Sequence, residues 1–231
     1  DAWVNAFMRA HKLEHRIVYD RKQDGAAQAW QAALASRDTS LDLPDGFYLQ
    51  ELEHVVLAQG LTTLDQYRTA RRTGRGVILS RAKRDAVWPV FEEYRGQLAS
   101  RKLKEVDDAY REVASLLEAE PANGKRYSAI VVDETQDFGP QALKLLRAMI
   151  GHGANDLFFV GDGHQRIYSR HKAAMSKCGI DIRGRSKKLY INYRTTDEIR
   201  RQAVALLEGV EIDDLDDGAD ETRRYRSLSH G

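Results

Sequence analysis

The sequence predicts an α/β protein in which a largely helical first part precedes a parallel sheet with covering helices. Apolar residues recur at helical spacing through about the first 120 residues. From Tyr127 onward, short apolar runs rich in β-branched residues alternate with helical segments, as they do in parallel sheets. A chain of 231 residues, 42% of them hydrophobic, is long enough to bury one large core or two small ones.

Turn residues delimit the helices of the first part. The helical pattern covers residues 27–34, 47–59, 87–98 and 106–117. Pro44 and Gly60 interrupt it, and Pro121 ends it. Pro89 predicts either a helix that begins near Trp88 or a kink, because proline removes one backbone hydrogen bond.

The second part alternates strands with helices. We expect strands over 129–132 and 157–160, both buried on their two faces, and a third over 188–191. Pro140 opens a helix that Gly151 and Gly153 close. Thr195 and Glu198 have the spacing of a capping box, which predicts a last helix that ends at Gly209.

Composition excludes several classes of protein. The 36 basic and 35 acidic residues nearly balance, which argues against a purely acidic or basic disordered chain. No stretch approaches the roughly 20 apolar residues of a membrane helix, and no signal peptide is apparent, so we expect no membrane partner. The single Cys178 excludes an internal disulfide and a cysteine zinc cluster and fits a reducing cytosol, so we expect a cytoplasmic protein.

Charge is segregated along the chain. Residues 68–104 and 164–201 each hold 11 basic and 3 acidic side chains, whereas 208–221 hold eight acids and no base. Aromatic residues accompany the two basic segments, namely Tyr67, Trp88, Tyr94, Tyr168 and Tyr190. Cations beside stacking faces favour a polyanion with bases as the partner. The alternative is an ordinary solvated surface, with 208–221 as an exposed loop.

Polar loops follow the three predicted strands, where a parallel sheet gathers functional groups. Asp133 and Glu134 follow the first strand: one carboxylate can hold Mg²⁺ and the other can activate the water that attacks a phosphoryl group. Gln165 and Tyr168 follow the second strand, and 192–194 (Asn-Tyr-Arg) the third. Each loop taken alone can equally be a polar strand exit, a plain turn or a surface arginine.

Taken together, the strings VVDETQDF, FVGDGHQRIY and LYINYRTTDE resemble motifs II, III and IV of the UvrD/Rep/PcrA family of superfamily 1 DNA helicases. The resemblance covers roughly residues 80–208. It implies part of a P-loop NTPase (RecA-like) sheet with a largely helical inserted subdomain. The domains it implies are a helical 1B-like subdomain with lead-in helices over 1–125, the C-terminal half of motor domain 1A over 126–180, and the start of motor domain 2A over 181–231.

The resemblance also implies roles in ATP hydrolysis. Asp133 resembles the Mg²⁺-coordinating acid, and Glu134 the general base. Gln165 resembles the glutamine that senses the γ-phosphate. Tyr193 corresponds to the residue that stacks on adenine, and Arg194 to the arginine finger. The implied cofactors are therefore ATP and Mg²⁺.

Two further positions concern DNA. Tyr168 resembles an aromatic residue that stacks on single-stranded bases. The family continues with a tryptophan, whereas this chain has Ser169 and Arg170, so we expect a cation contact from Arg170 instead. The implied partner is single-stranded DNA or a junction of single and double strands, translocation is 3′ to 5′, and the setting is DNA repair or replication.

The sequence departs from the family by lacking G-x-x-x-x-G-K-[ST], the loop that cradles phosphates. Gly124-Lys125 does not fulfil the pattern, and motifs V and VI are missing. We therefore expect an internal fragment of a longer ATP-dependent helicase, inactive alone. The alternatives are a non-catalytic nucleic-acid-binding or protein-docking module derived from a helicase, and a helicase fused to a nuclease outside these residues.

Overall fold

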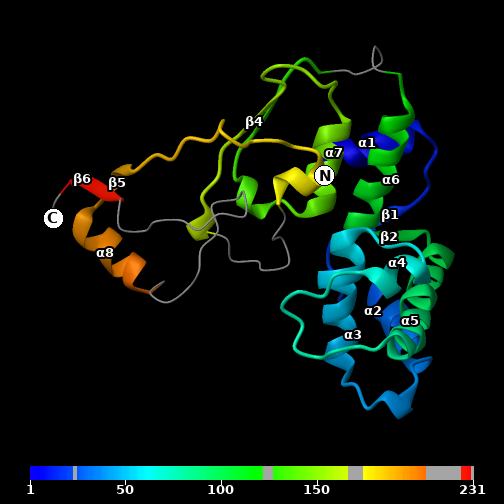
Figure 1. The fold of residues 1–231 in the computed structure, drawn as a ribbon. Coiled ribbons are helices and arrows are strands. Elements are labelled where there is room, and N and C mark those ends of the chain that lie inside the picture. The colour runs from blue at the N-terminus through cyan, green and yellow to red at the C-terminus, as the bar shows by residue number, and fades with distance from the viewer. Residues whose placement is uncertain (23–24, 122–126, 166–173, 207–224, 230–231) are drawn as a thin grey trace.

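The computed structural model describes residues 1–22, 25–121, 127–165, 174–206 and 225–229. The described part is mixed α/β, mostly helical, with three small parallel sheets rather than one large one. Figure 1 shows a lobe of helices α2 to α5, a second group around α1, α6 and α7, and a terminal unit of β5, α8 and β6. None of the described helices has both the length and the apolar character that crossing a membrane requires.

The helical lobe is built from the segments α2 (Ala26–Ala35), α3 (Asp45–Glu51), η2 (Leu52–Leu57), α4 (Leu64–Thr69) and α5 (Arg81–Ser100), with a short 3-10 turn η1 (Thr39–Leu41). η2 is a π-helical continuation of α3, so the predicted helix over 47–59 is confirmed with altered winding. A capping box of Thr63 and Gln66 starts α4. The lobe closes over large aromatic side chains that are almost fully buried, namely Trp88, Tyr48, Tyr67, Tyr94 and Phe91.

Helix α5 runs through Pro89, so the predicted helix start near Trp88 is wrong. Ser80 caps the helix by accepting a hydrogen bond from the backbone N–H of Lys83. Val87, Trp88, Val90 and Phe91 around the proline are all buried. Burial of these side chains offsets the hydrogen bond that proline cannot donate.

The second group contains α1 (Ala2–Ala10), α6 (Val106–Ala119) and α7 (Pro140–Ala148), and α6 packs closely against α7. β1 (Arg16–Val18) pairs in parallel with β2 (Leu103–Glu105), so the two ends of the helical lobe are tied together. The sequence pattern did not reveal these strands. Three residues are too few to establish an alternating pattern.

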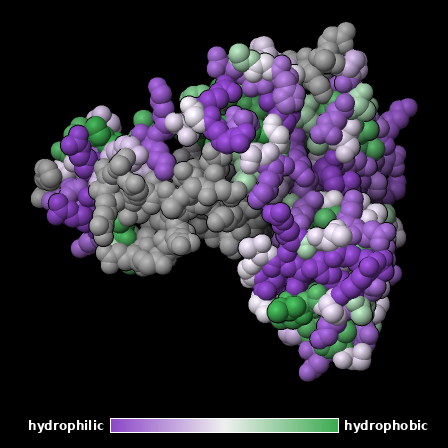
Figure 2. All heavy atoms as spheres, viewed as in Figure 1, coloured by the Kyte–Doolittle hydropathy of each residue, from purple (hydrophilic) through white to green (hydrophobic). Residues whose placement is uncertain are grey.

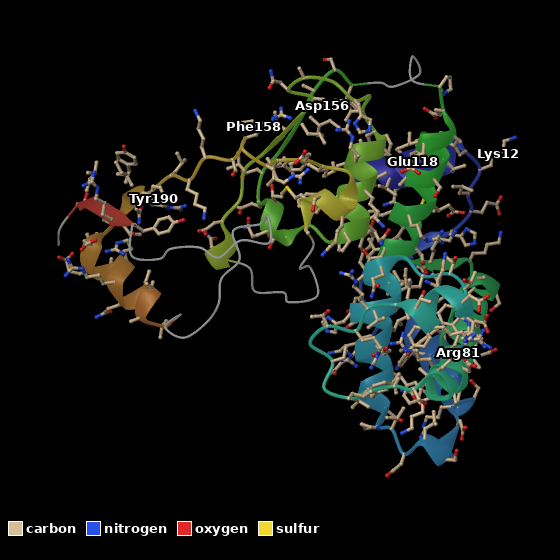
Figure 3. The ribbon with its side chains drawn as sticks, in the orientation of Figure 1. Lys12, Arg81, Glu118, Asp156, Phe158 and Tyr190 are labelled. Atoms are coloured by element: carbon tan, nitrogen blue, oxygen red, sulfur yellow. The ribbon has the colours of Figure 1, made fainter. Side chains whose placement is uncertain are left out.

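β3 (Ile130–Val132) and β4 (Leu157–Phe159) form the second parallel pair, which confirms these two strands. The expectation that both faces are buried is wrong. Val131 and Phe158 are partners in the register and are 71% and 61% exposed. Phe158 is labelled in Figure 3. Side chains alternate along a strand, and only the face of Leu157 and Phe159 packs on α7 and on η7 (Met175–Cys178).

β5 (Ile191–Thr196) pairs in parallel with β6 (Arg226–Ser229), and α8 (Asp197–Ala205) follows β5. The third strand therefore begins at Ile191 rather than Lys188, and 192–194 lie within it instead of in a loop. The N-cap is Thr196 and makes no side-chain cap bond, so the predicted capping box is wrong. The predicted helix end at Gly209 and the acidic segment 208–221 lie outside the described residues.

Two buried carboxylates organise the helical lobe. Glu51 is fully buried and accepts hydrogen bonds from Tyr67 Oη (2.9 Å), Arg72 Nε (2.6 Å) and Arg75 Nε (3.1 Å). Glu105 accepts from Tyr94 Oη (2.6 Å) and Arg21 Nε (2.5 Å). In both sites burial raises the pKa of the tyrosine hydroxyl, which therefore stays a donor to its carboxylate.

Glu51→Gln tests the first of these networks. The substitution leaves two largely buried guanidinium groups without their carboxylate, so we expect the free energy of unfolding to fall by about 3 kcal/mol. Urea unfolding measures the change. Glu14→Gln is the matched control, because Glu14 pairs with Lys102 at the exposed surface and the substitution should have little effect. Equal losses in the two variants would contradict the role of Glu51.

A second prediction concerns Asp156, just before β4. Burial raises the pKa of Asp156, but the Arg147 guanidinium (2.8 Å) and the backbone N–H groups of Gly153 and Leu157 lower it further, so the net pKa is below its usual value. The ionised carboxylate thus stabilises the fold above about pH 4, and this contribution is lost as pH falls toward the folded-state pKa. Asp156→Asn should have a lower free energy of unfolding than wild type at pH 7. The difference between the two proteins, measured by urea unfolding at a series of pH values, should disappear in acid.

Candidate functional site

The loop after β3 carries two exposed carboxylates next to two buried polar residues. Asp133 and Glu134 are exposed, whereas Thr135 and Gln136 are each 3% exposed. The Asp133 side chain accepts a hydrogen bond from the backbone N–H of Glu134 (2.9 Å). Glu134 itself has a left-handed backbone, with φ of 51°, directly before the turn η4 (Thr135–Asp137). A non-glycine residue in this conformation is uncommon, and such strain is concentrated at functional sites.

Buried polar contacts join this loop to the end of β4. The backbone N–H and the hydroxyl of Thr135 both donate to the carbonyl oxygen of Val160, at 3.0 and 2.7 Å. The Gln136 amide nitrogen donates to Glu134 Oε2 (2.6 Å), and its oxygen accepts from the backbone N–H of Asp162 (2.9 Å). The orientation of the amide is fixed by its partners, because the carboxylate only accepts and the N–H only donates.

Gly161 makes this close approach possible. A Cβ atom at this position would lie 2.9 Å from Gln136 Oε1 and 3.2 Å from both the Cβ and the backbone nitrogen of Thr135. Backbone φ is not the constraint here, because Gly161 is not among the residues of positive φ. The space between the two loops therefore requires glycine.

Gln165 extends the same set of contacts. It ends the short turn η5 (Gly163–Gln165), and its amide nitrogen donates to Asp162 Oδ2 (2.9 Å). Glu134, Gln136, Asp162 and Gln165 thus lie on one connected path, in which Asp162 contributes its backbone N–H on one side and its carboxylate on the other. The structure brings Asp133, Glu134 and Gln165 to the same edge of the β3–β4 pair.

The other predicted site residues are placed elsewhere. Tyr193 and Arg194 are exposed on β5, where the Asn192 side chain accepts a hydrogen bond from the Arg194 N–H (2.8 Å). No hydrogen bond or ion pair between described residues joins them to the loops after β3 and β4, and Figure 1 shows β5 in the terminal unit. Tyr168 and Arg170 lie outside the described residues.

The structure corrects the predicted stacking surface in the first basic segment. Tyr67, Trp88 and Tyr94 are at most 1% exposed, so they pack the core and are inaccessible to bases. Tyr190 packs against Tyr225, with ring centroids 5.3 Å apart. On α5, the sign of burial was that Trp88, Phe91 and Tyr94 recur every three residues, because residues at this spacing lie on one face of a helix.

Comparisons with known proteins identify the family of this chain. Residues 8–178 match the family model of the UvrD/REP helicase N-terminal domain. The chain belongs to this family. "ATP-dependent DNA helicase UvrD1" of Mycobacterium tuberculosis is 29% identical over 136 residues, or 53% of this chain and 18% of the relative. The protein of the same name from Mycobacterium leprae is 28% identical over 135 residues, or 51% and 17%. The chain spans less than a fifth of the length of these relatives.

Sequence reasoning missed the residues that hold the candidate site together. Gln136 had no assigned role, yet it is the side chain that contacts both Glu134 and the loop after β4. Thr135 and Gly161 hold the two loops together. The only signal in the sequence is their position next to the acids, because burial of a polar side chain after a strand depends on what the neighbouring strand places there.

The acids of this UvrD/REP domain fit a hydrated magnesium ion. Mg²⁺ in phosphoryl-transfer sites keeps several waters and takes one or two carboxylates together with phosphate oxygens. Asp133 and Glu134 are adjacent and exposed, which suits that ligand set. Among the described residues no group of three or more His, Cys, Asp or Glu side chains forms a dedicated metal cage.

Gly161→Ala tests the packing of the two loops. The added methyl group meets Gln136 and the Thr135 backbone, so we expect the free energy of unfolding to fall by about 2 kcal/mol. Gly153→Ala is the matched control, because a Cβ atom there has no neighbour within 4 Å. Chemical denaturation of both variants measures the difference, and a Gly161→Ala protein as stable as Gly153→Ala would disprove the close approach.

Proposed function

We propose that this chain is the part of an ATP-dependent DNA helicase that activates the hydrolytic water and connects hydrolysis to DNA. The contact of Gln136 with both Glu134 and the Asp162 backbone carries the proposal. A general base needs a fixed carboxylate, and a motor needs that carboxylate to be linked to the loop that senses phosphate or DNA. Buried Gln136 meets both needs: its amide nitrogen holds the Glu134 carboxylate, and its amide oxygen contacts the loop after β4.

The proposed roles follow the family. Asp133 would hold Mg²⁺, which would supply positive charge against phosphate oxygens. Glu134 accepts the proton of the attacking water, and Gln165, held by Asp162, contacts the γ-phosphate or the water. Exposed Tyr193 stacks on adenine, and Arg194 stabilises the transferring phosphoryl group.

Arg194 has to approach Glu134 for this chemistry, and we propose that ATP draws the β5 unit toward the loops after β3 and β4. A cleft that closes on the nucleotide and opens after hydrolysis converts turnover into movement. Tyr168 and Arg170 contact single-stranded DNA in this proposal. The same proposal includes the RecA-like fold and the domain limits at 125 and 180. It also includes 3′-to-5′ movement along the strand, strand separation at a duplex junction and a role in DNA repair or replication.

A second candidate function is a nucleic-acid-binding or docking module without catalysis. The observation that favours it is the lack of G-x-x-x-x-G-K-[ST] within the 231 residues. These 231 residues therefore lack the sequence of the loop that cradles the β- and γ-phosphates in P-loop proteins. The two candidates differ in whether a protein that joins these residues to a phosphate-binding loop hydrolyses ATP.

The ATPase assay decides between them. The 231-residue chain alone should show negligible magnesium-dependent ATP hydrolysis. The longer protein with a phosphate-binding loop should be active on single-stranded DNA, and Glu134→Gln should lower its kcat by about 100-fold or more with ATP binding retained. Glu118→Gln on α6 is the control and should leave kcat unchanged (Figure 3). A Glu134→Gln enzyme with normal kcat would rule out the proposed base.

A further inference from the structure

A hollow of about 470 Å³ lies where the end of the helical lobe meets α6, α7 and η7. Gly60 from the lobe, Arg111 from α6, Gln141 from α7 and Cys178 from η7 are among the residues that line it. This volume is within the range of small-molecule sites. Figure 2 shows hydrophilic atoms interspersed with hydrophobic ones over the group that holds α6 and α7, so a polar ligand suits this part of the molecule better than an apolar one.

The walls of this hollow are fixed by contacts within the fold. Gly60 has a φ of 68°, and a Cβ atom there would lie 2.9 Å from Gln141 Nε2, so the lobe and α7 meet closely. Gln141 Nε2 donates to the carbonyl oxygen of Ala58 (2.9 Å). Arg147 donates to Asp156 Oδ2 (2.8 Å) and to two backbone carbonyl oxygens. The hollow is therefore formed before a ligand arrives, and binding requires little ordering of the protein.

Buried polar atoms without partners gather at this hollow. Gln141 is 1% exposed, and its Oε1 accepts no hydrogen bond from any described residue. The Nε atoms of Arg111 and Arg147 are likewise buried and without a hydrogen-bond partner in the described part of the chain. Asp108 is 3.7 Å from Arg111 Nε, and its carboxylate already accepts two hydrogen bonds from Arg95. Such atoms are rare in folded proteins and indicate a partner that the chain itself does not supply.

The charges that remain available in the hollow are mainly positive. Lys144 is half-buried and His152 is exposed, and neither side chain has a hydrogen bond or ion pair with a described residue. The Arg111 guanidinium also donates no hydrogen bond to the residues that the structure describes. Glu118 is the acid of the lining and is exposed to solvent (Figure 3). Burial raises the pKa of the Cys178 thiol, so this residue adds no negative charge.

We propose that the hollow between the helical lobe, α6 and α7 binds a small phosphate monoester, with Lys144 and Arg111 on the phosphate oxygens. Ammonium and guanidinium groups form short, strong hydrogen bonds with phosphate. Arg147 forms part of the wall and is not counted as a ligand contact, because Asp156 already holds it. The inference does not depend on Glu134 or on ATP hydrolysis.

A single phosphate group matches this hollow better than a chain of phosphates does. The available cations are two side chains in one hollow, whereas nucleic acid is bound by cations spaced along its backbone. A hydroxyl group on the organic part of the ligand can donate to Gln141 Oε1, which is an acceptor without a donor. The chemistry of the hollow therefore favours a phosphate monoester that also carries hydroxyl groups.

Titration of the ¹⁵N-labelled chain with glucose 6-phosphate, followed by NMR, tests this site. The backbone amide signals of Gly60, Ala114 and Gly179, which all line the hollow, should shift with one Kd on the order of 1 mM. Glucose, which lacks the phosphate, should shift none of them. Lys144→Ala should weaken binding about tenfold, because a charge-assisted hydrogen bond is lost. Alanine favours the helical conformation, so α7 should remain folded.

Lys83→Ala is the matched control, because Lys83 is an exposed lysine on α5 outside this hollow, and its Kd should equal that of wild type. Glu118→Gln should bind at least as tightly as wild type, because an acid at the rim repels phosphate. Equal affinities of Lys144→Ala and Lys83→Ala would overturn the proposal, as would weaker binding by Glu118→Gln. A single-stranded oligonucleotide that shifts the same three amides at lower concentration, and needs Lys144 to do so, would assign the hollow to nucleic acid and reject the small molecule.

Discussion

Contact between the loops that follow β3 and β4 is the constraint on which the candidate site depends. A single Cβ atom at Gly161 would collide with Gln136 and Thr135, so the two loops can touch only because this position is glycine. That contact buries Gln136, and buried Gln136 in turn holds Glu134. The exposed carboxylate is therefore oriented by groups that water does not reach, where hydrogen bonds are stronger and less easily exchanged.

Arginine serves two purposes in the helical lobe. Arg72 and Arg75 compensate the charge of buried Glu51, which would be costly to bury alone. The same residues anchor the loop that carries Ile78, so the internal network determines what the surface presents. A basic segment in the sequence is thus neither wholly a binding surface nor wholly structural. The basic residues that pair with a carboxylate inside the fold are structural, and the others remain at the surface.

The three parallel pairs have different relations to the proposed function. β1–β2 closes the helical lobe, β3–β4 positions the carboxylates, and β5–β6 carries Tyr193 and Arg194. The proposed hydrolysis needs groups from the last two pairs together. Separate small sheets allow such groups to approach and withdraw without disrupting either core, as the proposed function requires.

The local sequence pattern was sufficient to predict several elements of this protein. Helical periodicity located α2, α5 and α6, β-branched runs located β3 and β4, and the order of the three strings indicated the family. It failed where the answer depends on a distant partner. β5 begins at Ile191 because β6, more than 30 residues later, supplies its hydrogen bonds, and Val131 is exposed because no described element covers that face.

The sequence by itself determined the family, the choice of Asp133 and Glu134 as candidate site residues and the placement of most helices. Each of these depends on residues that are close together in the chain. Only the tertiary structure decided that Tyr67, Trp88 and Tyr94 lie inside, that Gln136 links two loops and that Ile78 is uncovered. The physical reason is that burial and hydrogen-bond partnership are properties of pairs of segments, and chain neighbours do not specify which segments meet.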